Sequence, residues 1–255
     1  MSKCEPAVNL VGPSCQPSPG STVRLSILPP RGRYLQNQTA PTTAFGGSSM
    51  TSSRAFAEFF VPEHEAVLTA RGKATDLGCE PIGSGAGAAL TFLAAVLSAK
   101  AVVEIGTGTG VSGLHLLAGM APEGILTSID VEAEHQRAAK EAFGLFGVAP
   151  GRARLINGRG LEVMPRLTDG AYDLVLVDAD RTGYPQYVTE SIRLLRRGGV
   201  LVLAGALHGD RVADPTQRDA QTVAVREAGR MVREDETLVP MMTSLGDGLL
   251  AAVKR

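Results

Sequence analysis

Cysteine is scarce in this chain, and its pattern excludes two kinds of cross-linked protein. Three cysteines occur in 255 residues, at Cys4, Cys15 and Cys79, and no pair of them has C-x-x-C spacing. An odd count without such spacing argues against a disulfide framework and against a zinc cluster, and it is typical of a reducing compartment. We therefore expect a cytoplasmic protein.

Charge of one sign and long apolar runs are lacking as well. The 25 basic and 26 acidic residues give a net charge of −1 and alternate without blocks, so no nucleic-acid or membrane partner is expected. The most apolar stretch, from Gly85 to Ala99, is shorter than the roughly 20 residues of a membrane span and predicts a buried helix. The start of the chain, Met1–Pro6, has no apolar segment behind its charges, so a secretory signal is not expected.

The first 52 residues differ in composition from the rest. They contain seven of the fifteen prolines, with Ser, Thr, Gly and Asn between them. Such a segment buries too little apolar surface to offset its ordering entropy, so residues 1–52 are predicted to be a disordered arm before one domain, 53–255. The short apolar patch Val23–Leu28 leaves open that part of the arm binds a partner.

From residue 53 onward the apolar pattern predicts alternating helices and strands. A helical segment broken by Pro62 runs from Ser53 to about Gly78. Beyond it, the expected strands are 101–105, 124–130, 153–157, 172–178 and 198–203, and the expected helices are 111–119, 133–147, 161–167 and 184–195. Near-continuous Val/Ile/Leu strands that alternate with helices indicate a parallel sheet covered on both faces.

The end of the chain breaks this alternation. After a helix near 216–232, two apolar segments, 237–245 and 248–253, are joined by Gly246-Asp247-Gly248. A Gly-Asp-Gly joint between strands predicts a hairpin, so one further strand should run antiparallel at the end of the sheet.

The strongest local signal is the segment Val103–Gly110, which reads VEIGTGTG. Glycines between a strand and a helix let the backbone approach a ligand, as in nucleotide sites. The spacing here is G-x-G-x-G, and Glu104 stands two residues before the first glycine. A carboxylate would repel a diphosphate but attract a sulfonium and an amino group, so the pattern favours S-adenosylmethionine over a dinucleotide.

Two further acidic positions follow predicted strands. Asp130 ends the second strand, where a carboxylate can accept the hydroxyls of an adenosine ribose; the alternative role is to cap the helix that begins near Glu132. Asp178 and Asp180 end the fourth strand, at the sheet edge where open α/β folds bind ligands. For this pair the alternatives are helix capping and a solvated loop.

These residues together resemble a family. From Ser84 onward the chain resembles the cation-dependent O-methyltransferases, the group of catechol and caffeoyl-CoA O-methyltransferases. The matching segments are 104–112 (EIGTGTGVS), 128–130 (SID), 177–180 (VDAD) with Tyr184, 194–200 (LLRRGGV) and 245–250 (LGDGLL). The resemblance implies a Rossmann-like, doubly wound, mostly parallel sheet of seven strands with an antiparallel C-terminal strand. It also implies a homodimer and a small, hydroxylated aromatic acceptor.

The same resemblance assigns residues to the cofactor. It implies S-adenosylmethionine contacts at Ile82, Glu104, Gly106, Thr107, Gly108, Ser112, Asp130, Val131, Gly160 and Asp180. In the family the first acid of the Asp-x-Asp pair, here Asp178, binds the metal and faces the acceptor.

One departure from the family concerns the metal. The family places Asp-Asn after the fifth strand, whereas this chain has Ala204 and Gly205. Mg²⁺ requires oxygen ligands in octahedral array, and Asp178 alone supplies one carboxylate, so the metal site is predicted to be incomplete. The lysine that many relatives carry after Asp-x-Asp is Arg181, which cannot act as a base.

Without a metal, deprotonation of the acceptor falls to a side chain or to an acidic phenol. Asp178 is the first candidate for base or substrate anchor, and His208 is the second because its imidazole titrates near neutral pH; a surface loop is the alternative place for His208. Few aromatic residues could line an acceptor pocket: Phe59, Phe60, Phe92, Tyr184 and Tyr187. Of these, Tyr184 is expected to contact the acceptor, while Phe59 and Phe60 are expected to pack a helix on the core.

Three other functions share parts of this pattern. A nicotinamide-dependent oxidoreductase would have the glycine loop and Asp130, but Glu104 and the C-terminal hairpin count against it. An aminopropyl transferase would need a second acid-rich pocket, and no such pocket is visible in the sequence. A degenerate methyltransferase that binds the cofactor without catalysis is consistent with the missing Asp-Asn pair.

Overall fold

The computed structural model describes residues 49–255, with side chains from Ser53 onward. The predicted arm, 1–52, and the apolar patch Val23–Leu28 lie outside the described residues, apart from residues 49–52 at the start of helix α1 (Ser49–Glu58). The helix expected from Ser53 therefore begins four residues earlier than predicted. No helix within the described part of the chain is long and apolar enough to cross a membrane.

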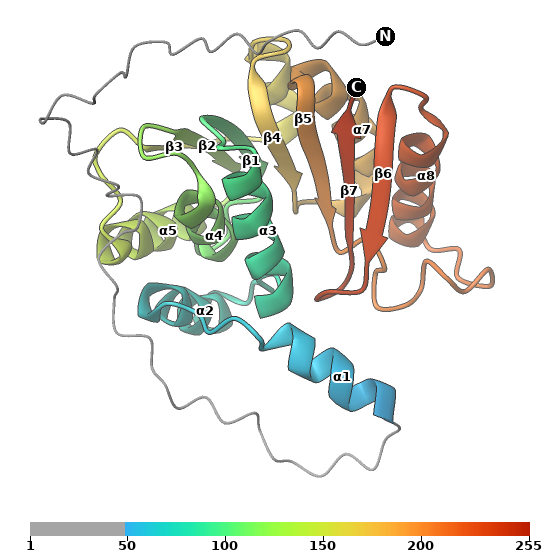
Figure 1. The fold of residues 1–255 in the computed structure, drawn as a ribbon, viewed down its shortest axis with the longest axis horizontal. Helices are drawn as coiled ribbons and strands as arrows, with labels where there is room; N and C mark the ends of the chain where they lie inside the picture. The colour runs from blue at the N-terminus through green and yellow to red at the C-terminus, as the bar shows by residue number, and fades with distance from the viewer. Residues whose placement is uncertain (1–48) are drawn as a thin grey trace, which may run out of the picture.

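Seven strands form a single sheet in the order β3-β2-β1-β4-β5-β7-β6 (Figure 1). They are β1 (Ala101–Ile105), β2 (Ile125–Asp130), β3 (Ala153–Asn157), β4 (Tyr172–Val177), β5 (Leu195–Ala204), β6 (Leu238–Thr243) and β7 (Leu249–Lys254). Strands β1 to β5 pair in parallel, and β7 pairs antiparallel with both β5 and β6. The predicted mostly parallel sheet with an antiparallel C-terminal strand is confirmed.

The last strand lies one place in from the edge of the sheet. After β5 the chain passes through α8 (Ala220–Glu234) to the outermost position, where it forms β6. The predicted hairpin at Gly246-Asp247-Gly248 then returns β7 into the gap between β5 and β6. Gly246 and Gly248 have φ of +55° and +87°, a conformation that favours glycine.

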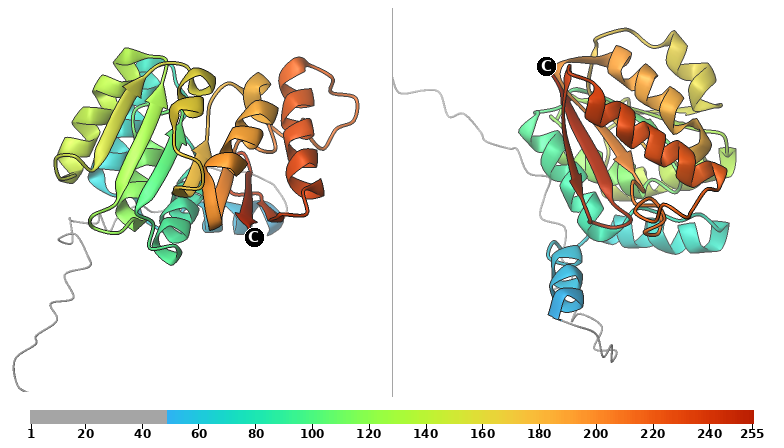
Figure 2. Two further views of the ribbon diagram at one scale, coloured as in Figure 1. Left: turned by 90° about the horizontal axis from the view of Figure 1, so that it is seen from above. Right: turned by 90° about the vertical axis from the view of Figure 1, so that its right-hand side faces the viewer.

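Helices cover both faces of the sheet (Figure 2). One face is covered by α2 (Glu65–Leu77), α3 (Ser84–Val96), α4 (Val111–Gly119) and α5 (Ala133–Phe146). The other is covered by α6 (Gly160–Val163), α7 (Tyr184–Leu194) and α8, with the short 3-10 helices η1 (Met164–Arg166) and η2 (Arg181–Gly183). The buried hydrophobic residues accordingly form two clusters, one on each side of the sheet.

The boundaries of one helix and one strand differ from those predicted. The helix expected over 161–167 is one α-helical turn followed by η1, because Pro165 cannot donate a backbone hydrogen bond to the preceding turn. The fifth strand starts at Leu195, three residues before the prediction. The predicted strand began at Gly198, but the observed strand also includes the three residues before it, next to a register irregularity against β4.

The prediction that Phe59 and Phe60 pack on the core is wrong. These side chains are 50% and 68% exposed, and the Phe60 ring instead contacts the ring of Phe56, with 5.8 Å between their centres. Helix α1 is held by a polar contact: the Glu58 carboxylate accepts hydrogen bonds from the backbone N–H of Gly85 (2.9 Å) and Gly246 (3.0 Å). An apolar anchor is therefore not needed to hold this end of α1.

Candidate functional site

A cavity of about 800 Å³ opens at the carboxyl ends of β1, β2 and β4. This is the edge of a parallel sheet at which α/β folds bind ligands. Ten of the residues singled out in the sequence line it: Ile82, Gly106, Thr107, Gly108, Ser112, Asp130, Val131, Gly160, Asp178 and Asp180. Chain segments far apart in the sequence therefore meet around one space, as the strand-end positions of these residues predicted.

The glycine loop between β1 and α4 forms one wall of the cavity. Gly106 has φ of +95°, and a Cβ at this position would collide with the carbonyl oxygen of Asp178. Gly108 has φ of +49° and no atom within 4 Å of the place where its Cβ would stand. The first glycine therefore lets two strand ends approach each other, and the second leaves open space beside the backbone for a ligand.

Asp130 connects the end of β2 to this loop. Its carboxylate accepts hydrogen bonds from the backbone N–H of Gly108 and of Glu132, both at 2.8 Å. Helix α5 begins at Ala133 with Glu132 as its N-cap residue, so Asp130 does not cap it. Asp130 therefore shapes the loop and lines the cavity beside it.

Glu104 lies beneath the cavity and does not line it. Its side chain points to the α4 side of the sheet and is fully buried, and Ser128 donates a hydrogen bond to Oε2 at 2.5 Å. The other oxygen, Oε1, has no hydrogen-bond partner among the described residues. Burial raises the pKa of Glu104 to about 7, although hydrogen bonds from Ser112 and Ser128 act in the opposite direction.

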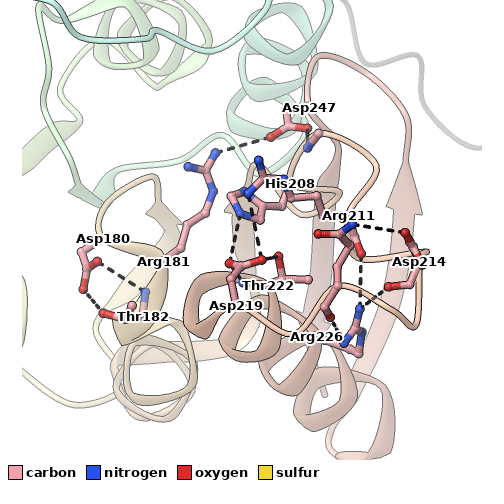
Figure 3. A network of polar contacts seen from close by, with 12 residues as sticks. Asp180, Arg181, Thr182, His208, Arg211, Asp214, Asp219, Thr222, Arg226 and Asp247 are labelled. Atoms are coloured by element: carbon pink, nitrogen blue, oxygen red, sulfur yellow. Dashed lines mark hydrogen bonds and ion pairs between the residues drawn. The ribbon is translucent and has the colours of Figure 1, made fainter.

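The two acids after β4 have different surroundings. Asp178 is partly exposed to the cavity, and burial raises its pKa to about 6 although the charge of Arg181 opposes this shift. Asp180 is exposed at the rim and accepts a hydrogen bond from the Thr182 hydroxyl at 2.6 Å, at the start of η2 (Figure 3). Asp180 therefore caps η2, which was one of the alternatives that the sequence left open. It also lines the cavity, as predicted from its place after β4.

Tyr184 and His208 do not line this cavity. The Tyr184 side chain is buried, and its hydroxyl donates to the carbonyl oxygen of Ala204 at 2.8 Å. The His208 side chain is 11% exposed, so it is not on an open surface loop, and its Nε2 lies 3.9 Å from Asp219. Burial, together with the charges of Arg181 and Arg211, lowers the pKa of His208, so the imidazole is neutral at neutral pH.

Several residues of the cavity wall were not predicted as site residues. They include Cys79, His135, Arg159 and Tyr187, the last of which was considered only as a possible aromatic lining residue. His135 lies 3.8 Å from the Asp130 carboxylate, one turn into α5. The sequence signal that could have identified Arg159 was its position, since it follows the end of β3 just as Asp130 ends β2.

The residues present do not fit a divalent cation at the family's metal position. Ala204 and Gly205 have no side-chain oxygen, and a Cβ at Gly205 would lie 2.8 Å from Nη2 of Arg181. Within residues 49–255 no group of three His, Cys, Asp or Glu side chains is arranged to hold a metal ion. The guanidinium of Arg181 thus occupies the space beside Gly205, one of the two positions at which the resemblance implies further metal ligands.

Comparisons with known proteins agree with this geometry. Residues 66–255 match the family model described as O-methyltransferase. A Mycobacterium ulcerans (strain Agy99) protein named "Putative O-methyltransferase" is 52% identical over 200 residues, which are 78% of this chain and 89% of the relative. A crystal structure of a Corynebacterium glutamicum protein is similar with a TM-score of 0.75 and 35% identity, over 81% of this chain and 97% of that one.

A further crystal structure shows a ligand in a similar protein. It is that of the O-methyltransferase TomG from Streptomyces achromogenes, involved in tomaymycin synthesis, in complex with S-adenosylmethionine. It has a TM-score of 0.71 and 27% identity, over 80% of this chain and 96% of that chain. With a family model covering most of the chain and relatives aligned over most of their own length, this chain belongs to the O-methyltransferase family.

Proposed function

We propose that the protein transfers a methyl group from S-adenosylmethionine to a hydroxyl oxygen of a small acceptor. The observation that carries this proposal is that the glycine loop, Asp130 and Asp178 all line the same cavity. The glycine loop and Asp130 suit a nucleoside and Asp178 suits a polar acceptor, so both reactants fit next to each other. Membership of the O-methyltransferase family supports the same reaction.

The cofactor would be held chiefly by the backbone and by carboxylates. Asp130 would accept the ribose hydroxyls, the open side of Gly108 would receive the ligand, and Asp180 would stand at the rim. Glu104 would add negative charge beneath the loop, and its unpartnered Oε1 is consistent with a cation or a polar group above it. When bound, S-adenosylmethionine supplies a methyl group whose bond to sulfur breaks as the bond to the acceptor oxygen forms, with the electron pair left on sulfur.

The protein's part in the reaction is alignment and removal of the acceptor's proton. Holding two reactants in attack geometry contributes several kcal/mol to lowering a barrier, roughly 7–11 in the most favourable intramolecular cases. Asp178 is the proposed base or anchor because its carboxylate lines the cavity. His208 and Tyr184 are less well placed, because neither side chain lines the cavity and the Tyr184 hydroxyl is bound to the carbonyl oxygen of Ala204.

Replacing the proposed base separates binding from turnover. Asp178→Asn is expected to lower turnover by about 100-fold or more, in the range of 10²–10⁴-fold that general acid–base catalysis contributes, while S-adenosylhomocysteine affinity changes little. The measurements are transfer of labelled methyl and calorimetric titration on the same preparation. Unchanged turnover would remove Asp178 from the chemistry.

The experiment that tests the function itself is titration of S-adenosylhomocysteine, in Mg²⁺ and again in EDTA. Micromolar binding in both buffers, weakened in Asp130→Asn, is the expected result. A folded protein that binds in neither buffer would contradict the proposal and return attention to a nicotinamide cofactor. Binding without transfer to any acceptor would favour a cofactor-binding protein that has lost catalysis, which the missing Asp-Asn pair makes the second candidate.

We also infer that the protein is a homodimer. The support is an apolar patch on the outer strands, formed by Val239, Met241 and Val253, which are 46%, 52% and 41% exposed. Contiguous exposed apolar surface of this kind commonly marks an interaction site. The cytoplasmic location, the small size and aromatic nature of the acceptor and the absence of nucleic-acid and membrane partners stay predictions from the sequence.

A further inference from the structure

The side chain of Arg181, three residues after the cavity-lining Asp178, fills the space beside Gly205. A Cβ at Gly205 would lie 2.8 Å from Nη2 and 3.4 Å from Nε of Arg181. Gly205 has φ of +62°, so most other residues would be strained at this position even without the arginine. The guanidinium and the glycine therefore occur together: the small residue makes room for the large cation.

The position of this guanidinium is fixed by an acid from the C-terminal hairpin. Nη2 of Arg181 lies 3.4 Å from Oδ2 of Asp247, whose other oxygen accepts a hydrogen bond from the backbone N–H of Gly209 at 2.7 Å (Figure 3). The charge of Arg181 lowers the pKa of Asp178, whereas the charge of Asp247 raises it. A positive charge thus stands against the Asp247 carboxylate and beside Gly205, one of the two positions at which the family resemblance implies metal ligands.

Two polar atoms in this cluster make no hydrogen bond, although one of them, Nε2 of His208, lies 3.9 Å from the Asp219 carboxylate. Nε of Arg181 and Nε2 of His208 are buried, and neither has a hydrogen-bond partner among the described residues. Figure 3 shows the guanidinium beside the imidazole of His208. Buried polar groups are nearly always hydrogen-bonded, so two unpartnered nitrogens in one cluster indicate a polar ligand that completes it. His208 is held with φ of +48°, a conformation uncommon outside glycine and typical of functional sites.

We propose that the Arg181 guanidinium takes the place of the family's divalent cation and pairs with the one acceptor oxygen that receives the methyl group. This inference rests on the proposed function. A divalent cation binds two neighbouring oxygens of a vicinal diol, whereas the free Nε–H of a guanidinium already bound to Asp247 can hold one anionic oxygen. The acceptor is therefore a molecule with a single ionisable hydroxyl of the phenol type, and a second, adjacent hydroxyl adds nothing.

The first test measures metal binding and needs no acceptor. The complex with S-adenosylhomocysteine is titrated with Mn²⁺, and free Mn²⁺ is followed by its electron paramagnetic resonance signal. Wild type is expected to bind no Mn²⁺ at millimolar concentration. The variant Arg181→Ala/Ala204→Asp/Gly205→Asn, which removes the guanidinium and restores the family's ligands, is expected to take up one ion; asparagine is among the residues that tolerate a positive φ.

Two results of this titration would overturn the inference. One is stoichiometric Mn²⁺ binding by wild type that is lost in Asp178→Asn. The other is a triple variant that still binds S-adenosylhomocysteine, and is therefore folded, but takes up no Mn²⁺. If instead S-adenosylhomocysteine fails to bind folded wild type, the proposed function fails, so the two failures are distinguishable.

The second test uses a matched pair of acceptors, phenol and catechol, in EDTA. Wild type is expected to methylate both with kcat/KM within a few-fold, and Arg181→Met to lose about 100-fold in kcat, the typical cost of removing one donor to a developing oxyanion. Arg181→Lys, which keeps the charge but not the planar fork, should retain part of the rate. Turnover that requires Mg²⁺, or an Arg181→Met enzyme as active as wild type, would contradict the inference. If wild type methylates neither phenol nor catechol, the Mn²⁺ titration decides.

Discussion

At the scale of single residues, the unusual feature of the site is a carboxyl group buried without a cationic partner. Glu104 is fully buried between Ser128 and the first turn of α4. The helix N-terminus favours negative charge, but burial outweighs it and raises the pKa of Glu104 to about 7. Near neutral pH this side chain is therefore close to the point at which it changes charge, and a cationic ligand above it would favour the ionised form.

The raised pKa makes stability depend on pH in a defined direction. An unfolded glutamate ionises near 4.5 and the folded one near 7, so the contribution of Glu104 is fully present below pH 4.5 and is lost as pH rises through about 7. At about 1.4 kcal/mol per pKa unit, the loss is on the order of 3 kcal/mol. Glu104→Gln should remove this part of the pH dependence, measured by urea unfolding at pH 5 and pH 8. The exposed Glu141→Gln serves as a control, and an unchanged pH dependence in Glu104→Gln would contradict the assignment.

The glycine loop and the strand-end acids were predictable because their signals are local. A positive φ at Gly106 and a carboxylate at the end of β2 follow from residue type and position within a few residues. The surroundings of His208, Tyr184 and Arg181 were not predictable in this way. Whether Tyr184 points to the cavity or to the Ala204 carbonyl depends on how α7 packs against β5, and this packing involves residues 20 positions apart.

At the scale of elements, a largely buried ionic cluster joins two helices to the wall of the cavity. Glu63, just before α2, accepts two hydrogen bonds from Arg71, at 2.7 and 2.6 Å, and its Oε1 lies 3.2 Å from Nε2 of His115 in α4. Arg71 also donates to the carbonyl oxygen of Ile82 at 2.7 Å, and Ile82 lines the cavity. The cluster therefore positions the segment through which Ile82 lines the cavity.

Breaking this cluster should lower the free energy of unfolding by an amount that depends on pH. Burial alone would raise the pKa of Glu63, but hydrogen bonds from His115 and Arg71 outweigh it and lower the pKa to about 2. The contribution is therefore present above pH 4.5 and is lost as pH falls through about 2. Glu63→Gln is expected to destabilise the fold by about 3 kcal/mol at pH 7, close to the cost of breaking a buried ion pair, and by much less near pH 2. Equal destabilisation at both pH values would show that the charge of Glu63 is not what matters.

The boundaries of elements were less predictable than their order. The alternation of apolar runs specified five parallel strands and a closing hairpin, and the sheet contains them in that sequence. The position of β7 between β5 and β6 was not foreseen, because hydrophobic patterning does not say on which side of its partner a returning strand will lie. The helical pattern predicted α1 but not how it is held, since Glu58 binds backbone N–H groups 27 and 188 residues away.

At the scale of the whole molecule, the two faces of the outer strands differ. Helix α8 packs against one face of β6 and β7, and in Figure 1 the opposite face is turned toward the viewer with no helix in front of it. Val239 and Val253 are paired across these strands, and Met241 lies two residues along on the same face. Pro240 interrupts the donors of the edge strand β6, so a partner would contact this patch through side chains and not by adding a strand.

If this patch is the dimer contact, charge placed in it will separate the subunits. Burying a valine or methionine stabilises a contact by about 1.5–3 kcal/mol, and a symmetric interface counts each residue twice, so Val239→Glu/Met241→Glu should shift the dimer to monomer at micromolar concentration. The measurement is sedimentation equilibrium, with wild type expected at twice the 26.6 kDa chain mass. Met242→Glu is the matched control, because it is 50% exposed on the same strand but alternates to the α8 side. A monomeric wild type would refute the homodimer, and a double variant that stays dimeric would place the contact elsewhere on the surface.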